Sequence, residues 1–305
     1  MFARAPCGDD PGMRPSKLLE APAEAIERAQ WLDGANSVTK KAVDAALPSP
    51  AVRDALHGVW FGHPLHPALI VLPLGSWISA SLLDFLPGSR KAARTLVGFG
   101  VLATVPTAAA GLADWSDLHP QQQRTGLVHA GLNTVGLVLQ AASWRARRQG
   151  RQARGVGYSL AALGLGGLSA YLGGHLSYRQ AAGVNHAEQA PHVLPEEWTR
   201  LCALTDLPDG EPTRLSLTEA PVFVLRRGDR VDALYDECSH LSGPLSEGEL
   251  TGAGDELCVT CPWHGSVFRI RDGAVRQGPT TSPQPVLQVR VDPDGSVLAR
   301  LGEDD

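Results

Sequence analysis

Two short segments of this chain combine cysteine and histidine at the spacing of metal ligands. Residues 238–240 read Cys-Ser-His, and residues 261–264 read Cys-Pro-Trp-His. Thiolate sulfur and imidazole nitrogen are common ligands of zinc and of iron. Zinc fingers usually group two cysteines on one loop and two histidines on another, whereas each segment here supplies one of each. A zinc-binding module therefore stays open only as an alternative. The four candidate ligands are Cys238, His240, Cys261 and His264.

This mixed order, with glycine and proline after both segments, resembles the Rieske 2Fe-2S domain. The resemblance covers residues 197–301, about a third of the chain. It implies one 2Fe-2S cluster, with Cys238 and Cys261 on one iron and His240 and His264 on the other. Neutral imidazoles in place of two thiolates remove negative charge, which favours the reduced cluster and raises its potential.

The same resemblance points to residues that tune the cluster. Ser266 resembles the hydroxyl that donates to a cluster sulfide in the high-potential class, whereas Phe268 stands where that class has tyrosine. Gly243 and Trp263 stand where quinol-oxidising Rieske proteins carry an extra disulfide. The chain is thus closer to the ferredoxin and oxygenase type, and we expect a lower potential than in the quinol-oxidising class. Cys258 is expected to pack as a small strand residue.

The chain has two parts that differ in composition and charge, and each must form different elements around these residues. Of its 305 residues, 43% are apolar, which excludes a disordered or disulfide-stapled protein. Residues 1–195 carry 17 basic and 12 acidic residues, a net charge of +5, whereas residues 196–305 carry 10 and 20, a net charge of −10. Four stretches lack Asp, Glu, Lys and Arg, and each is near or above the roughly 20 residues that cross a bilayer.

We therefore predict a multidomain chain, with an N-terminal all-α four-helix transmembrane bundle and a C-terminal all-β, Rieske-type small antiparallel domain. Short β-rich runs at 222–225, 231–234, 257–260 and 286–291 indicate the second part. The expected segments are a polar, amphipathic N-terminus (1–55), the membrane domain (56–180), a linker (181–196) and the Rieske domain (197–305). The expected spans are 64–83, 95–113, 125–144 and 155–178.

Charge in the loops predicts the orientation of the bundle. Four spans place both chain ends and the 114–124 loop on one face, and two arginine-rich loops on the other. Eight basic residues in those two loops, against Arg124 alone in the opposite loop, favour a cytoplasmic location for the arginine loops. The Rieske domain is then expected on the outer face of a bacterial cell membrane. Asp84, at the cytoplasmic end of span one, is expected to be an interfacial charge.

Four histidines and one aspartate are predicted to lie at the outer end of the bundle. His129 and Asn133 are one helical turn apart and share a face. Ionisable groups at membrane depth are candidates for function, here a haem, another metal or a quinone site. The alternative is that they cap helices and bond across the bundle. The candidates are His63, His66, His129, His175 and Asp114.

Residues 55–184 also resemble an uncharacterised bacterial family of four-span membrane proteins of unknown function. The resemblance rests on a His-Pro-Leu-His-Pro start, a Gly-Leu-Ala-Asp-Trp close of span two, and the motifs at 128–133 and 173–176. Its members are sometimes followed by a Rieske domain. This supports the architecture and brings no established activity.

The sequence thus predicts a membrane-anchored Rieske protein, an oxidoreductase or electron-transfer protein, that carries single electrons. Its donor would be a membrane quinol or haem. Its acceptor would be a redox protein with a basic docking surface that matches the acidic domain. No nucleic-acid partner is expected. The alternatives are a Rieske component of an oxygenase, with an iron held by His129, His175 and Asp114, and a non-redox zinc-binding anchor.

Overall fold

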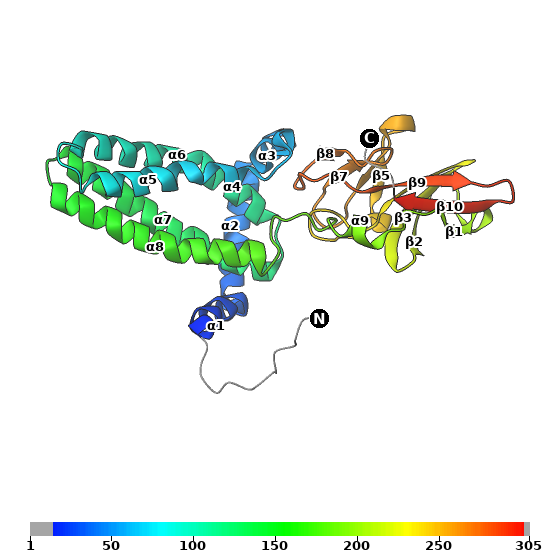
Figure 1. Ribbon diagram of the computed structural model, residues 1–305, viewed down its shortest axis with the longest axis horizontal. Coiled ribbons are helices and arrows are strands. Elements are labelled where there is room, and N and C mark those ends of the chain that lie inside the picture. Colours follow the sequence, from blue (N-terminus) through cyan, green and yellow to red (C-terminus); the bar gives the residue numbers. More distant parts are fainter. Residues whose placement is uncertain (1–14, 302–305) are drawn as a thin grey trace, which may run out of the picture.

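The computed structural model describes residues 15–301, which form a helical region followed by a β-rich domain (Figure 1). The two parts lie end to end in an elongated molecule. The expected multidomain layout is therefore confirmed, although the helical part contains more helices than the four that the sequence predicts.

Long helical segments lie side by side in the bundle. They are α4 (Leu65–Leu69) continued by α5 (Val71–Leu83), then α6 (Arg90–Ser116), α7 (Pro120–Arg148) and α8 (Gln152–Tyr178). Ile70 keeps helical backbone angles, so α4 and α5 act as one segment. By length and composition, three segments can cross a membrane: 65–83, α6 and α8. A 27-residue helix such as α6 is about 40 Å long, which exceeds the roughly 30 Å of a hydrocarbon core.

Helix α7 contains the window predicted as span three, but it is not among these three apolar helices. The reason is a row of polar side chains that bond inside the bundle. His129 bonds to Ser169 of α8, and Gln140 accepts a hydrogen bond from Ser159 of α8. Polar groups shielded from lipid in this way lower the hydropathy of a helix without exposing it to hydrocarbon.

Glycines let the helices of the bundle approach one another closely. A Cβ atom on Gly100 of α6 would lie 2.3 Å from Nε1 of Trp77, and one on Gly126 of α7 would lie 2.5 Å from Cδ1 of Trp115. No larger residue fits beside either indole ring. Small residues are typical of helix contacts in lipid, where packing replaces the hydrophobic effect as the driving force.

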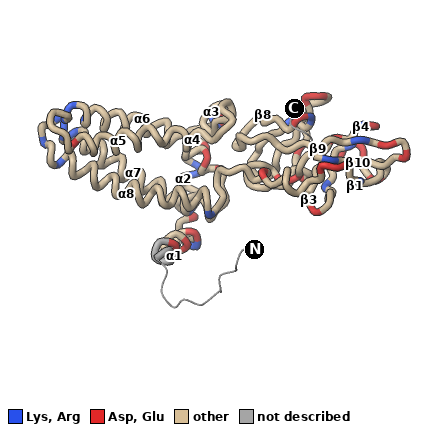
Figure 2. The backbone as a smooth tube through the Cα atoms, in the orientation of Figure 1, with Lys and Arg blue, Asp and Glu red and all other residues tan. Residues whose placement is uncertain are grey.

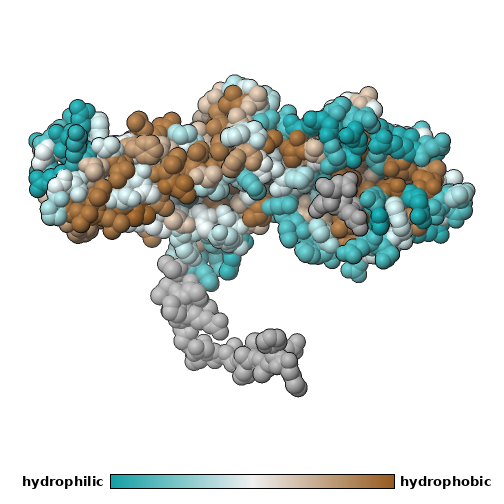
Figure 3. All heavy atoms as spheres, turned by 45° about the horizontal axis from the view of Figure 1, so that its top comes forward, coloured by the Kyte–Doolittle hydropathy of each residue, from teal (hydrophilic) through white to brown (hydrophobic). Residues whose placement is uncertain are grey.

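The bundle end away from the β domain carries the basic loops, and a brown apolar surface covers the helices between the two ends (Figures 2 and 3). One ion pair at this basic end is buried inside the bundle. Arg147 donates to both carboxylate oxygens of Asp84, at 2.5 and 2.6 Å, and only 1% and 5% of these two side chains is exposed. Asp84 was expected as an interfacial charge, but it is a buried partner of α7.

Three helices precede the bundle: α1 (Pro15–Glu27), α2 (Asp33–Ala46) and α3 (Pro50–His57). Short 3-10 turns at Gln30–Leu32 and Val59–Phe61 separate them from one another and from α4. Arg124 of α7 donates to Asp33 and to the carbonyl of Glu27, and Lys40 donates to the carbonyl of Ser116. These bonds hold the N-terminal helices on the end of the bundle that faces the β domain.

The β domain consists of two antiparallel sheets. The larger has the order β1-β10-β9-β4-β3-β2, and the smaller has the order β5-β6-β7-β8. Apolar side chains on the inner side of the larger sheet, such as Phe223, Leu225 and Leu234, pack against Val259 and Phe268 of the smaller. The strands are β1 (Thr199–Ala203), β2 (Pro212–Leu217), β3 (Ala220–Arg227), β4 (Arg230–Tyr235), β5 (Glu249–Thr251), β6 (Cys258–Thr260), β7 (Val267–Arg269), β8 (Val275–Gln277), β9 (Val286–Val291) and β10 (Ser296–Leu301).

The connection between the two parts is packed onto the β domain. Short helix α9 (Ala190–Val193) follows the bundle, and Ala187, Ala190 and Leu194 join the core of the larger sheet. His186 donates its backbone N–H to the carbonyl of Ser239, at 3.0 Å. The segment leading into the β domain therefore contacts the loop that carries Cys238.

Candidate functional site

The first cysteine–histidine segment forms a tight loop between β4 and β5. The backbone N–H of Cys238 donates to the carbonyl of Gly243, and the N–H of Ser242 donates to the carbonyl of Cys238, at 2.9 and 2.8 Å. Gln284, buried beneath the loop, accepts the N–H of Ser239 at 3.0 Å. These bonds fix the directions in which Cys238 and His240 point.

The second segment is a matching loop between β6 and β7. The N–H of Cys261 donates to the carbonyl of Ser266, at 2.8 Å, and the N–H of Gly265 donates to the carbonyl of Cys261, at 3.1 Å. Gly265 has a φ of 77°, which glycine adopts without strain. The turn leaves Cys261 buried and His264 half-buried.

The two loops bring like ligands together. The thiols of Cys238 and Cys261 lie close enough for each to shift the pKa of the other, and the rings of His240 and His264 lie 5.0 Å apart between centroids. Among residues 15–301, no three His, Cys, Asp or Glu side chains surround one point as a single metal ion requires. A pair of thiols beside a pair of imidazoles instead fits a two-iron cluster, because each iron then needs only two protein ligands.

Backbone N–H groups lie close to both sulfur atoms. The N–H groups of Trp263 and His264 lie near the Sγ of Cys261, and the N–H of His240 lies near the Sγ of Cys238. The thiol of Cys238, together with these N–H groups, lowers the pKa of Cys261. The thiol of Cys261 and burial raise the pKa of Cys238. Such donors stabilise thiolate, the form in which cysteine binds metal.

One buried nitrogen of the site has no partner. The Nδ1 atom of His240 makes no hydrogen bond, although it is shielded from solvent. Burial, and then the charge of His264, lowers the pKa of His240 to about 3, so its ring is neutral. An unsatisfied buried polar atom is costly, and a neutral imidazole is the form that ligates metal. This atom therefore fits an iron ligand.

The neighbouring residues also fit a cluster. A Cβ atom on Gly243 would lie 2.8 Å from the Sγ of Cys261 and 3.0 Å from the Cγ of Trp263, so only glycine leaves this space open. The hydroxyl of fully buried Ser266 lies near Cys238 and acts to lower the pKa of that thiol. Cys258 lies in β6, with its thiol donating to the carbonyl of Glu256 at 3.4 Å.

The five candidate residues of the bundle do not form a common metal site among the described residues. His66 bonds to the carbonyl of Thr107 at 2.9 Å, and His175 bonds to Glu27. His63 is exposed, and its ring lies 6.1 Å from that of Phe61 in an edge-to-face arrangement. These contacts match the structural interpretation, in which the side chains bond across the bundle or lie at its end.

His129 shows this most clearly, because both of its ring nitrogens have partners. Nδ1 lies 2.8 Å from the carbonyl oxygen of Ser169, and Nε2 lies 3.0 Å from Nδ2 of Asn133. The expected shared face of His129 and Asn133 is thereby confirmed. The triad of His129, His175 and Asp114 does not assemble, because each residue bonds to a different partner.

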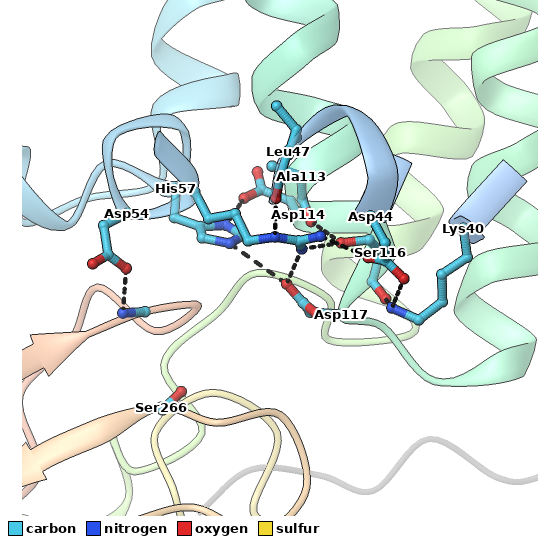
Figure 4. Close-up of polar contacts among 12 residues, drawn as sticks. Lys40, Asp44, Leu47, Asp54, His57, Ala113, Asp114, Ser116, Asp117 and Ser266 are labelled. Carbon is cyan, nitrogen blue, oxygen red and sulfur yellow. Dashed lines mark hydrogen bonds and ion pairs between the residues drawn. The ribbon is translucent and has the colours of Figure 1, made fainter. Parts of the chain in front are cut away.

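Asp114 instead belongs to a charged network that the sequence analysis missed (Figure 4). Buried His57 of α3 lies between two carboxylates, with Nδ1 2.8 Å from Asp114 and Nε2 3.5 Å from Asp117. Arg53 extends the network to Asp44, at 2.6 Å. No local pattern marks these residues, because they come from three separate helices and one loop.

The two carboxylates determine the charge of His57. Burial lowers the pKa of the ring, but the hydrogen bonds and charges of Asp114 and Asp117 outweigh it and raise the pKa of His57 to about 9. Asp117 responds in the opposite direction, since the bond to His57 lowers its pKa despite burial. At neutral pH the network therefore contains a charged imidazolium close to the cysteine–histidine loops.

A second missed residue, His119, touches the candidate site directly. Its ring centroid lies 5.5 Å from those of His264 and Trp263, with each pair edge to face. The sequence places the 114–124 loop on the side of the Rieske domain, but nothing in that loop singles out His119. A histidine followed by proline at the start of a helix is the only local signal.

Comparisons with known proteins agree with both parts of the architecture. Residues 197–290 match the family described as the Rieske 2Fe-2S domain. Residues 62–186 match the family described as a predicted membrane protein, DUF2231.

Several relatives are ferredoxins. The anthranilate 1,2-dioxygenase ferredoxin subunit of Burkholderia cepacia is 36% identical over 106 residues, which cover 35% of this chain and 94% of that protein. Ferredoxin CarAc of Metapseudomonas resinovorans is 36% identical over 95 residues, or 31% of this chain and 85% of that protein. The solved ferredoxin of carbazole 1,9a-dioxygenase from Nocardioides aromaticivorans IC177 has 30% identity and a TM-score of 0.31, and covers 34% and 98% of the two chains.

Proposed function

Because this chain belongs to the Rieske 2Fe-2S family, with a DUF2231 membrane domain ahead of its Rieske domain, we propose that it is a membrane-anchored carrier of single electrons. A Rieske domain implies one 2Fe-2S cluster, which when bound accepts and releases one electron at a time. The membrane domain keeps that cluster within reach of donors in the bilayer.

Cys238, His240, Cys261 and His264 are the ligands in this proposal. The observation that carries it is the arrangement of two adjoining thiols beside two imidazoles, one of which has a buried nitrogen without a partner. The zinc alternative would need all four side chains around one ion. Such a group is absent among residues 15–301.

The donor in this proposal is a quinol or a haem protein of the same membrane. The Rieske domain lies outside the cytoplasm, because the basic loops occupy the opposite end of the bundle. Fusions at the C-terminus test this orientation. Alkaline phosphatase should be active there and a fluorescent protein dark, whereas the reverse pattern would place the cluster in the cytoplasm.

The acceptor is a redox protein with a basic docking surface, since residues 196–305 carry a net charge of −10 (10 basic, 20 acidic). A second candidate function is electron delivery to an oxygenase, which the names of the relatives favour. Gly243 and Trp263 agree with the ferredoxin type, so the potential should lie below that of the quinol-oxidising class. A redox titration that gives a potential as high as that class would refute this expectation.

The central experiment uses the full-length protein purified in mild detergent. Electron paramagnetic resonance (EPR) spectra of the reduced protein should show a Rieske signal, with two irons and two sulfides per chain. Zinc in place of iron would overturn the proposal. Haem in the same sample would identify a donor bound to the chain, and a third iron outside haem would favour the oxygenase alternative.

A further inference from the structure

The loop that joins two helices of the bundle lies against the exposed side of the candidate cluster site. His119, in the loop between α6 and α7, places its ring edge to face with both His264 and Trp263, 5.5 Å from each ring. His264 in turn lies 5.0 Å from His240. The membrane domain therefore contacts the half of the site that the two imidazoles form.

The position of His119 is fixed by the membrane domain alone. His119 precedes the first turn of α7, where the Gln122 side chain accepts the backbone N–H of His119, at 2.9 Å. Pro120 occupies the first helical position, which favours this helix start. Gln122 also donates to the carbonyl of Gln180, at 2.8 Å, which ties the start of α7 to the end of α8.

A second contact joins the same two domains beside the site. Asp54 of α3 accepts the backbone N–H of Gly278, at 2.8 Å (Figure 4). A Cβ atom on Gly278 would lie 3.1 Å from Val59 and 3.3 Å from His57, so the loop around Gly278 is close against the helical region. Two residues further on, the N–H of Thr280 donates to Ser266, at 3.3 Å. The contact between domains thus extends to the residues under the cluster.

We propose that the membrane domain completes the cluster site, with His119 as a positioning residue that holds the ring of His264 and shields it from water. This inference rests on the proposed function. The match to the Rieske family covers residues 197–290, so a residue of the helical domain such as His119 lies outside the matched region.

The shielding should affect the cluster electrically. Reduction adds one negative charge, and water stabilises a charge better than a covered site does. Removal of the His119 ring opens the His264 side to solvent and favours the reduced state. The midpoint potential should therefore rise, and the EPR signal should change because the His264 ring can reorient.

Two variants separate the ring contact from the role of His119 in starting α7. His119→Asn keeps a side chain that caps helices well but removes the ring. His119→Phe keeps an aromatic ring but removes the ring nitrogens. We expect a higher potential and altered g values for His119→Asn, with His119→Phe close to the wild type. His63→Asn, at an exposed histidine of the same bundle end, should match the wild type in both readouts.

The outcomes distinguish this inference from the proposed function. A wild-type protein without a Rieske signal refutes the function itself. If the wild type shows a Rieske signal but His119→Asn has the same potential and g values, only the role of His119 is refuted. The same holds if these readouts change in His119→Phe as much as in His119→Asn, or more. Iron loss in His119→Asn alone would support the contact between the His119 and His264 rings. Iron loss in His119→Phe, or in both variants, would contradict it.

Discussion

The histidines of the two domains differ in what their ring nitrogens contact. His240 has a buried Nδ1 atom without a partner, whereas both nitrogens of His129 are bonded within the bundle. His57 is held between two carboxylates, and His175 is bonded to Glu27. The Nδ1 atom of His240 is therefore available to bind a metal, whereas the ring nitrogens of His129 are already bonded. Burial alone does not distinguish a ligand from a structural histidine, but the pairing of its nitrogens does.

The largest expected effect comes from removing one of these histidines from each domain. His240→Ala should abolish the cluster, because it removes one of two ligands from an iron. His129→Ala should retain two irons and two sulfides per chain, because its ring bonds only to Ser169 and Asn133. Iron and sulfide assays on both purified variants check this. Iron loss in the His129 variant would show that the bundle histidines take part in metal binding.

A glycine substitution tests how closely the ligand loops fit together. Gly243→Ala would place a Cβ atom 2.8 Å from the Sγ of Cys261, so the loops must separate and most of the cluster should be lost. Gly265→Ala is the matched control, since its Cβ would meet nothing within 4 Å and only its positive φ is unfavourable. The control should lose about 1 kcal/mol of stability and keep its iron. Equal iron content in the two variants would contradict the close fit.

The buried pair at the opposite end of the bundle should affect stability without affecting the cluster. Arg147→Met leaves the buried carboxylate of Asp84 without its cationic partner, with only Gln152 still donating to it. This should cost about 3–5 kcal/mol and lower the melting temperature in detergent. The double variant Arg147→Met/Asp84→Leu should regain most of this loss. The EPR signal of either folded variant should equal that of the wild type, and a changed signal would mean that this end of the bundle influences the cluster.

His57 should make stability depend on pH. Its pKa is raised to about 9 in the folded protein, against about 6.5 in an unfolded chain. Its stabilising contribution is therefore complete below pH 6.5 and is lost as the pH rises through 9. The melting temperature of the wild type should exceed that of His57→Gln most at pH 6, and the difference should shrink by pH 9.5. His192→Gln, at an exposed histidine, should show no such trend.

The smallest expected effect concerns the tuning of the cluster. Ser266→Ala removes a buried hydroxyl near Cys238, the candidate donor to a cluster sulfur. Hydrogen bonds to sulfur favour the reduced cluster, so the midpoint potential should fall while iron content stays unchanged. Ser216→Ala, at an exposed position of β2, is the control in the same redox titration. An unchanged potential in the Ser266 variant would exclude a tuning role.

The spacing of residues along the chain was enough to predict strands, membrane spans and candidate ligands. The runs at 222–225, 231–234 and 286–291 lie within β3, β4 and β9, because alternation and turn residues act over a few positions. The four expected spans coincide with α4 and α5 together, α6, α7 and α8 for a similar reason, since a span is a continuous property of about 20 residues. The paired Cys and His segments are equally local, so the candidate ligands could be named from the sequence.

Only the tertiary structure decided which polar side chains meet. Arg147 bonds to Asp84, 63 residues away, and Asp54 bonds to Gly278, 224 residues away. His57 and His119 carry no local signal, yet one lies between two carboxylates and the other touches His264. Hydrogen bonds and ion pairs act over a few ångströms, whatever the separation along the chain. The ligand loops follow from the sequence, but the contact between the membrane domain and the cluster site depends on how the two domains pack.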